Sequence, residues 1–238
     1  MNKGSFLYRF LKVILTPILR GLYRVKAEGL QNIPAEGPVI IVANHVSFLD
    51  SFWIPVCLPR RMVYLAKAEY FESWKTAWFF RALGMIPVKR DVKEKTEAAL
   101  QAGIEVLDEG GVLGLYPEGT RSGDGRLYRG RTGVARLALR SRASVVPVGL
   151  VGSREVMPKQ ARFPKLWGNV RVKFGEPISF ERYHDEDEDR FVLRAMTDEI
   201  MFEIMALSGQ TYVDEYSSKE ATDVIPEDFR IPVGELLG

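Results

Sequence analysis

His45 and Asp50 are the two residues whose types and spacing could do chemistry together. His45 is one of only two histidines in the 238-residue chain, and it follows the apolar run Val39-Ile40-Ile41-Val42-Ala43. An imidazole exchanges a proton near neutral pH, and a carboxylate on its second nitrogen fixes its tautomer and stabilises the cation. The pair could therefore work as a general base with its orienting acid.

The spacing of five residues limits how the two side chains can meet. Within one helix, at about 100° per residue, they would point roughly 140° apart. They can meet only if His45 precedes a helix and Asp50 lies in its first turn. Ser47 is a favourable N-cap, and Asp50 three residues later is placed as in a capping box. Two interpretations stay open: a capped helix with a loop histidine, or a catalytic pair. They do not exclude each other.

The elements that must position these residues predict an α/β domain. Residues 39–43 lack polar alternation and four of them are β-branched, which is typical of a strand buried on both faces. Apolar runs alternating with helical segments predict a mostly parallel or mixed central sheet flanked by helices. We expect further strands over 62–66, 84–88, 112–116, 144–150 and 170–174. We expect further helices over 48–56, 71–83, 93–108, 133–141 and 185–207.

Three of the predicted strand ends carry polar residues suited to a ligand site. They are His45, the Lys89-Arg90 pair and the loop 117–122. Ligands of α/β sheets gather at the carboxyl ends of the strands, and arginine binds phosphate bidentately. Arg121 is therefore the favoured anion-binding residue. Glu118 cannot bind an anion directly, so we expect it to hold its loop by accepting hydrogen bonds or by pairing with an arginine.

The other cations near these strand ends are explained at least as well by a solvated surface. They are Lys89, Arg90, Arg126, Arg129 and Arg131. The chain has no Gly-x-Ser-x-Gly motif, so a covalent enzyme nucleophile is unsupported. We therefore expect the base to activate a hydroxyl group of a substrate.

Residues 5–24 predict a basic amphipathic helix, with Phe, Leu and Ile on one side and Arg and Lys on the other. Such helices lie in the interface of a bilayer with their cations at anionic head groups. Membrane docking is therefore favoured, and a terminal helix packed on its own domain stays open as the alternative. Pro17 is expected to kink or split the helix. We find no uncharged apolar stretch of the length needed to cross a membrane.

The composition, with 46% hydrophobic residues and a net charge of +2, fits one domain with a substantial core. Any basic surface must come from local clustering. Cys57 is the only cysteine, which excludes an internal disulfide and a cysteine-based zinc site, and its apolar neighbours predict a buried thiol. His184 lies in an acidic run that reads as a solvated helix start, so no metal is assigned.

Four blocks in family order resemble those of the glycerolipid acyltransferases, specifically the bacterial 1-acylglycerol-3-phosphate acyltransferases. They are Asn44-His45-Val46-Ser47-Phe48-Leu49-Asp50, which resembles the His-x4-Asp block, Gly84-Met85-Ile86-Pro87-Val88-Lys89-Arg90, Tyr116-Pro117-Glu118-Gly119-Thr120-Arg121-Ser122 and Val145-Val146-Pro147-Val148. Tyr116 stands where the family usually has Phe. The resemblance covers roughly residues 25–180, and the tail after about residue 210 has no counterpart that we can place.

The resemblance implies that His45 is the general base that deprotonates a glycerol hydroxyl and that Asp50 orients it. The alcohol would then attack the thioester of acyl-CoA or acyl-carrier protein directly. Arg90 and the Glu118-Gly119-Thr120-Arg121 loop would bind or frame the acceptor phosphate, and Lys67 would support the oxyanion. No cofactor is expected beyond the acyl donor as co-substrate.

The expected organisation is an N-terminal docking segment (1–25), an α/β acyltransferase domain (26–209) and a C-terminal tail (210–238). The resemblance implies acylation of 1-acylglycerol-3-phosphate to phosphatidic acid, in phospholipid biosynthesis. Expected partners are a membrane surface with anionic lipids, the lysophospholipid and the acyl donor, and not nucleic acid. The expected location is peripheral, on the cytoplasmic face of the cell membrane. The alternatives are another lysophospholipid or glycerol phosphate as acceptor, or a non-catalytic module that binds anionic membranes.

Overall fold

The computed structural model describes residues 3–73, 77–78, 80, 84–88, 93–183 and 189–217. Seven strands form one sheet in the order β1-β8-β7-β2-β5-β3-β4. Their bounds are β1 Lys26–Glu28, β2 Val39–Ala43, β3 Met62–Lys67, β4 Met85–Val88, β5 Val112–Leu115, β7 Ser144–Val151 and β8 Arg171–Phe174. All neighbours run parallel except β7 and β8, which are antiparallel. The predicted α/β class with a mixed sheet is confirmed.

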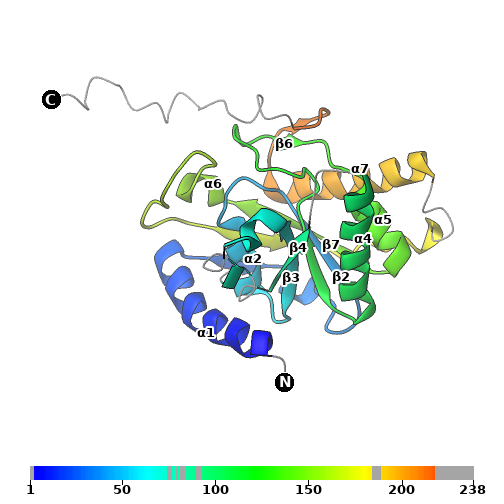
Figure 1. Ribbon diagram of the computed structural model, residues 1–238. Coiled ribbons are helices and arrows are strands. Elements are labelled where there is room, and N and C mark those ends of the chain that lie inside the picture. Colours follow the sequence, from blue (N-terminus) through cyan, green and yellow to red (C-terminus); the bar gives the residue numbers. More distant parts are fainter. Residues whose placement is uncertain are drawn as a thin grey trace.

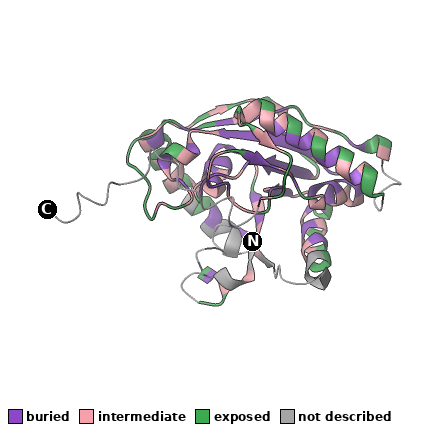
Figure 2. Cartoon of the chain, turned by 90° about the horizontal axis from the view of Figure 1, so that it is seen from above, coloured by how far each residue is buried: buried purple, intermediate pink, exposed green. Residues whose placement is uncertain are grey.

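Helices cover both faces of this sheet (Figure 1). Their bounds are α1 Lys3–Tyr23, α2 Asp50–Cys57, α4 Lys93–Asp108, α5 Gly133–Ser141, α6 Ser153–Val156 and α7 Arg190–Ser208, with 3-10 turns η1 Leu30–Asn32, η2 Ala68–Phe71 and η3 Glu181–Tyr183. Helices α1 and α2 pack on one face, while α4, α5 and α7 pack on the other. In Figure 2 the central strands are buried between these layers and the outer helix faces are exposed.

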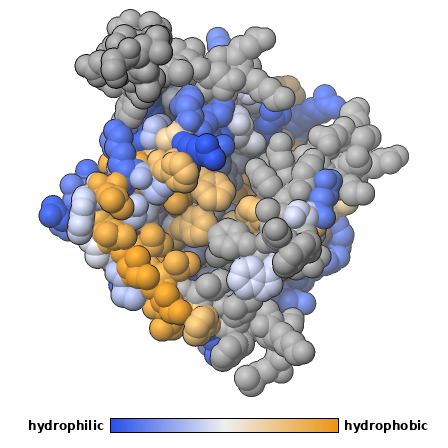
Figure 3. Space-filling view, turned by 60° about the vertical axis from the view of Figure 1, so that its left-hand side comes forward, coloured by the Kyte–Doolittle hydropathy of each residue, from blue (hydrophilic) through white to orange (hydrophobic). Residues whose placement is uncertain are grey.

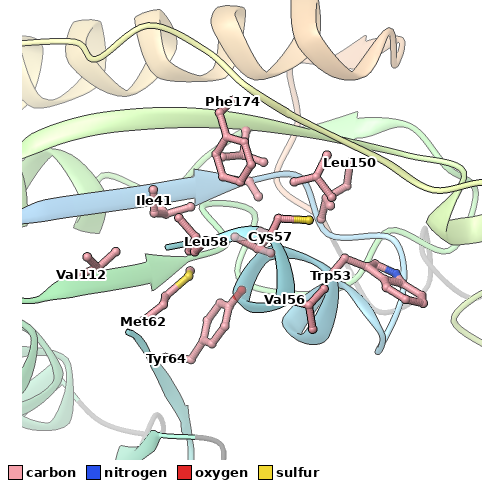
Figure 4. Close-up of a cluster of buried hydrophobic side chains, with 14 of the residues drawn as sticks. Ile41, Trp53, Val56, Cys57, Leu58, Met62, Tyr64, Val112, Leu150 and Phe174 are labelled. Carbon is pink, nitrogen blue, oxygen red and sulfur yellow. The ribbon is translucent and has the colours of Figure 1, made fainter. Parts of the chain in front are cut away.

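Strand β2 lies at the centre of the sheet and is buried at every position. Ile40 and Val42 pack in the cluster of α4, α5 and α7, whereas Ile41 packs with α2 residues such as Trp53. Figure 4 shows the second cluster, in which Cys57 lies among apolar side chains as the sequence predicts. Burial on both faces explains why this strand lacks polar alternation.

Three predictions differ from the structure, and two more fall partly outside the described residues. Helix α2 begins at Asp50 rather than at Phe48. Pro17 lies inside α1, so the helix is not split there. The strand pair β6 (Leu127–Tyr128) and β9 (Tyr212–Val213) was not predicted, and it draws the start of the tail onto the domain. The predicted helix over 71–83 is described only in part, with a helical backbone at 77, 78 and 80. The predicted helix 185–207 falls partly on residues outside the described ranges and continues as α7.

Helix α1 packs on the domain by the side that carries Tyr8, Lys12, Leu19 and Tyr23. Lys12 donates to the carbonyl of Leu58, and Arg20 donates to the carbonyl of Val56 at 3.4 Å. Both acceptors lie at the C-terminal end of α2, where cations are stabilised by the helix dipole. These two cations therefore bind the domain, as the alternative of a terminal helix packed on its own domain expects, whereas membrane docking stays a prediction.

The opposite side of α1 presents apolar side chains to the surroundings. They are Phe10, Val13, Ile14 and Ile18, with exposed fractions between 42% and 73%. The spacing of these residues places them in one stripe along the helix. In the described part of the chain no helix has the length and apolar character needed to cross a membrane.

Candidate active site

The structure brings His45 and Asp50 into direct contact. His45 follows the end of β2, and Asp50 is the first residue of α2, which is the arrangement that the spacing requires. His45 Nδ1 lies 2.9 Å from Asp50 Oδ2. Because an ionised carboxylate only accepts hydrogen bonds, the imidazole donates from Nδ1 and its lone pair lies on Nε2. This tautomer suits proton abstraction by Nε2.

Asp50 is fully buried and accepts four hydrogen bonds. Besides His45, its Oδ2 accepts from the backbone N–H groups of Val46 and Ser47, each at 2.8 Å. The bond from Ser47 N is one half of the predicted capping box. The other half is absent, because Ser47 Oγ accepts from Leu49 N rather than from Asp50 N. The carboxylate thus holds the loop and the imidazole at once. The predicted N-cap at Ser47 is wrong, because the N-cap of α2 is Leu49, which makes no side-chain capping bond, and catalysis by the His45–Asp50 pair stays a prediction.

Ser153, which no sequence motif indicated, completes the set of donors. Its hydroxyl donates to Asp50 Oδ1 and accepts from Trp53 Nε1 at 2.9 Å. Because the indole N–H can only donate, it leaves the hydroxyl proton of Ser153 for Asp50. Trp53, Ser153, Asp50 and His45 therefore form one directed chain of hydrogen bonds. Ser153 lies 103 positions after Asp50, so no local pattern could have found it.

Tyr116 fixes the plane of the His45 ring. The two rings stack with centroids 3.9 Å apart and planes 10° from parallel. Tyr116 also stacks on Tyr64, and its hydroxyl lies within 3.4 Å of the hydroxyls of Tyr64 and Ser51. Burial raises the pKa of Tyr116 far above that of an ordinary phenol, so this side chain stays neutral.

Glu118 joins the loop after β5 to the His45 loop. Its two oxygens accept from the backbone N–H groups of His45 at 3.1 Å and Tyr128 at 3.0 Å. Ser122 N donates in turn to the carbonyl of His45 at 2.7 Å. These contacts match the loop-holding arrangement expected of this residue, whereas its part in substrate binding stays a prediction.

Burial raises the pKa of Glu118 to about 8, although the N–H groups of Tyr128 and His45 lower it. Below that pH the carboxyl group is mostly protonated. It then carries no negative charge that would repel an anionic ligand at the same strand ends.

Arg121 stands out among the cations of this region. The three arginines that follow it have partners, which are Asp124 for Arg126, Asp214 for Arg129 and the Tyr216 ring for Arg131. Among the described residues, no hydrogen bond or ion pair engages the guanidinium of Arg121. Its neighbour Ser122 donates to the carbonyl of His45, so the backbone that carries Arg121 lies next to the His45 loop.

The remaining predicted substrate residues are placed as follows. Gly119 turns the loop with φ 75°, a conformation that favours glycine, and Thr120 is half-buried beside it. Lys67 is the last residue of β3 and so lies at the same sheet edge, but its side chain is outside what the structure describes. Arg90 and His184 lie outside the described residues.

The site as a whole holds an imidazole, oriented by a carboxylate, at the same sheet edge as the loop that carries Arg121. The parallel register of β2 with β5 and β7 brings His45, the Glu118 loop and Ser153 to one edge of the sheet. Asp50 would stabilise the imidazolium that forms. In the described part of the chain, no three histidine, cysteine or acidic side chains gather as a metal site would require.

A family model described as Acyltransferase matches residues 24–151, which is more than half of the chain. The protein belongs to the acyltransferase family. The matched range contains His45, Asp50 and the Glu118–Arg121 loop, and it ends just before Ser153. All four blocks identified in the sequence, the last of them over 145–148, therefore lie within the range that the family model matches.

Curated members of this acyltransferase family resemble the chain over different lengths. The chain is 33% identical over 157 residues to a chloroplastic 1-acyl-sn-glycerol-3-phosphate acyltransferase of Arabidopsis thaliana, covering 66% of this chain and 44% of that protein. It is 29% identical over 211 residues to the 1-acyl-sn-glycerol-3-phosphate acyltransferase of Bacillus subtilis, covering 86% and 98%. The chain thus spans less than half of the plant relative but nearly all of the bacterial one.

The crystal structure of the 1-acyl-sn-glycerophosphate acyltransferase from Thermotoga maritima has a similar fold. The TM-score is 0.65 at 26% sequence identity, over 86% of this chain and 79% of that one. The α/β fold of the chain is therefore the one found in a solved acyltransferase, in agreement with the family match.

Proposed function

We propose that this acyltransferase moves a fatty acyl group from an acyl thioester to the free glycerol hydroxyl of 1-acylglycerol-3-phosphate. The product would be phosphatidic acid, as phospholipid biosynthesis requires. The observation that carries the proposal is the 2.9 Å contact between His45 and Asp50, next to the loop after β5 that carries Arg121. The names of the plant and bacterial relatives support this choice of acceptor.

In the proposed reaction, His45 Nε2 takes the proton of the glycerol hydroxyl as its oxygen attacks the thioester carbon. The new ester bond forms as the carbon–sulfur bond breaks, and the thiolate leaves with the proton that His45 returns. Asp50 stabilises the imidazolium between these two steps. A positioned base of this kind contributes on the order of 10² to 10⁴ to the rate.

We propose an anionic acceptor because the guanidinium of Arg121 could bind its phosphate. Arg121 would bind the phosphate bidentately, and Gly119 would let the backbone approach it closely. Arg90 and Thr120 would frame the phosphate, and Lys67 would support the oxyanion, as the family resemblance implies. Coenzyme A and acyl-carrier protein both remain acyl donors in this proposal.

The proposed location is peripheral, on the cytoplasmic face of the cell membrane, with α1 in the lipid interface. The apolar stripe of Phe10, Val13, Ile14 and Ile18 supports this placement, because it faces away from the domain. A lysophospholipid acceptor is itself a membrane component, so a docked enzyme would meet its substrate in the bilayer. Anionic lipids would attract the cations that remain exposed on α1.

The test is release of free thiol from acyl-CoA in the presence of 1-acylglycerol-3-phosphate. We expect His45→Ala to lose about 10² to 10⁴ in turnover while it binds vesicles as the unmodified protein does. His184→Ala changes the only other histidine and should keep full turnover. Near-normal turnover by His45→Ala would refute the mechanism.

Two alternatives are separated by the same assay. A panel with glycerol 3-phosphate and larger lysophospholipids identifies the acceptor, and turnover of an acceptor without phosphate would contradict the role of Arg121. A non-catalytic membrane-binding module would release no thiol with any acceptor. The directed hydrogen-bond chain to His45 argues against that module, since membrane binding needs no oriented base.

A further inference from the structure

The loop between α6 and β8, residues 157–168, exposes large apolar side chains. Phe163, Leu166 and Trp167 are 73%, 71% and 70% exposed, and residues 162–167 form an unbroken exposed run. Single exposed apolar residues are ordinary on a protein surface, but a group of three on one short loop indicates a partner.

The loop is held in shape by its own backbone. Lys165 N donates to the carbonyl of Val156 at 2.8 Å, and Ala161 N donates to the carbonyl of Pro158 at 3.0 Å. Trp167 adopts φ 64°, a conformation that costs energy for a bulky residue. The apolar side chains are therefore presented outward by an ordered loop instead of collapsing onto the domain.

The charges of the loop identify the kind of partner. Lys159, Arg162 and Lys165 lie within it, and residues 157–168 contain no acid. Tryptophan and phenylalanine flanked by lysine and arginine are typical of segments that enter the interface of a bilayer with anionic lipids. The cations would lie at the head groups while the three apolar side chains enter the acyl boundary.

The loop ends next to the C-terminal end of α1. Val170, two residues past the loop, donates to the carbonyl of Tyr23 at the end of α1, at 3.1 Å. The loop and α1 lie on the same side of the molecule in Figure 1, and Figure 3 shows apolar side chains gathered on that side. The loop also follows β7, whose carboxyl end lies at the sheet edge of His45.

We propose that the loop 157–168 is a second membrane contact, which inserts Phe163, Leu166 and Trp167 into an anionic lipid surface beside α1. The lipid contact itself does not depend on the proposed function, but its benefit to the enzyme does. Two contacts would fix the orientation of the domain and hold the strand ends with His45 toward the bilayer. One helix alone would let the domain rotate about the helix axis.

The test compares two matched double variants of the full chain. Phe163→Ser with Leu166→Ser changes the loop, whereas Phe191→Ser with Phe202→Ser changes two exposed apolar residues of α7. Binding is measured by flotation with vesicles of phosphatidylcholine and phosphatidylglycerol in equal parts, without substrate. We expect the loop variant to bind about tenfold more weakly or worse and the α7 variant to bind normally.

A second measurement reports on the side chain of Trp167 directly. Brominated lipids in the same vesicles should quench the protein's tryptophan fluorescence, and Trp167→Phe should remove part of that quenching. Unchanged vesicle binding by the loop variant would overturn the proposal. So would normal vesicle binding combined with lost binding to acyl-carrier protein, which would assign the loop to an acidic protein.

Turnover on a short-chain, water-soluble lysophosphatidate separates this proposal from the proposed function. The loop variant should keep full turnover on that acceptor and lose it on vesicle-borne acceptor. If the unmodified protein transfers no acyl group to either form, the proposed function fails, and the flotation result still decides the role of the loop.

Discussion

Asp50 and Glu118 are both buried carboxyl groups at neighbouring strand ends, yet their surroundings differ. Asp50 accepts four hydrogen bonds, of which two come from the side chains of His45 and Ser153. Among the described residues, Glu118 accepts two hydrogen bonds, both from backbone N–H groups, and burial raises its pKa to about 8. One carboxyl group is linked to a group that can react, whereas the other is linked only to the chain.

In the proposed mechanism Asp50 takes part in catalysis and Glu118 does not, because burial alone does not make a carboxyl group catalytic. Donors that favour the charged form must offset the loss of water, and the partner must be a group that changes its charge in the reaction. Asp50 has such a partner in His45. Glu118 instead joins the loop after β2 to the loop after β5 through the backbone N–H groups of His45 and Tyr128.

The largest effect is expected when the carboxylate of Asp50 is replaced. In Asp50→Asn the amide group cannot accept from all four donors, so His45 loses its fixed tautomer. We expect turnover to fall by about 10³-fold or more, and stability to fall by about 1–3 kcal/mol because buried N–H groups lose their acceptor. Thiol release and urea unfolding measure the two effects. Unchanged turnover would show that His45 needs no carboxylate.

A smaller effect is expected when one donor to Asp50 is removed. Ser153→Ala should lower kcat by about tenfold and leave KM unchanged, because Ser153 touches Asp50 and not the substrate. Trp53→Phe, which removes the donor to Ser153, should lower kcat less. The double variant should be no slower than Ser153→Ala, since the two side chains act through one chain of hydrogen bonds. Additive losses would refute that chain.

The smallest expected effect is the contribution of Glu118 to the pH dependence of stability. A carboxyl group with a pKa of about 8 in the folded protein and about 4.5 when unfolded keeps its proton up to a higher pH in the folded state. The stability of the unmodified protein should therefore fall as pH rises between these values, by up to about 1.4 kcal/mol per pH unit from this group. Glu118→Gln cannot titrate, so its stability should vary less with pH.

Urea unfolding from pH 5 to pH 8.5 measures this difference. Glu118→Gln should be the less stable protein at pH 5, because the amide group leaves one backbone N–H without an acceptor. The gap between the two proteins should narrow toward pH 8. Parallel stability curves would show that Glu118 is ionised throughout this range.

Much of the fold and part of the site follow from local sequence. The run 39–43 predicts a strand buried on both faces because no polar residue interrupts it, and the structure places it at the centre of the sheet. The spacing of His45 and Asp50 predicts a loop followed by a first helical turn, which the structure shows. Strands β6 and β9, of two residues each, leave no period to detect, so the packed start of the tail was missed.

By itself, the sequence determined the α/β class, the His45–Asp50 pair and the amphipathic character of α1. Only the tertiary structure decided that Ser153 completes the donors to Asp50 and that Lys12 and Arg20 cap α2 while apolar residues face outward. The physical reason is range. Period and spacing report contacts within one element, whereas these partners lie in elements that meet only when the chain has folded.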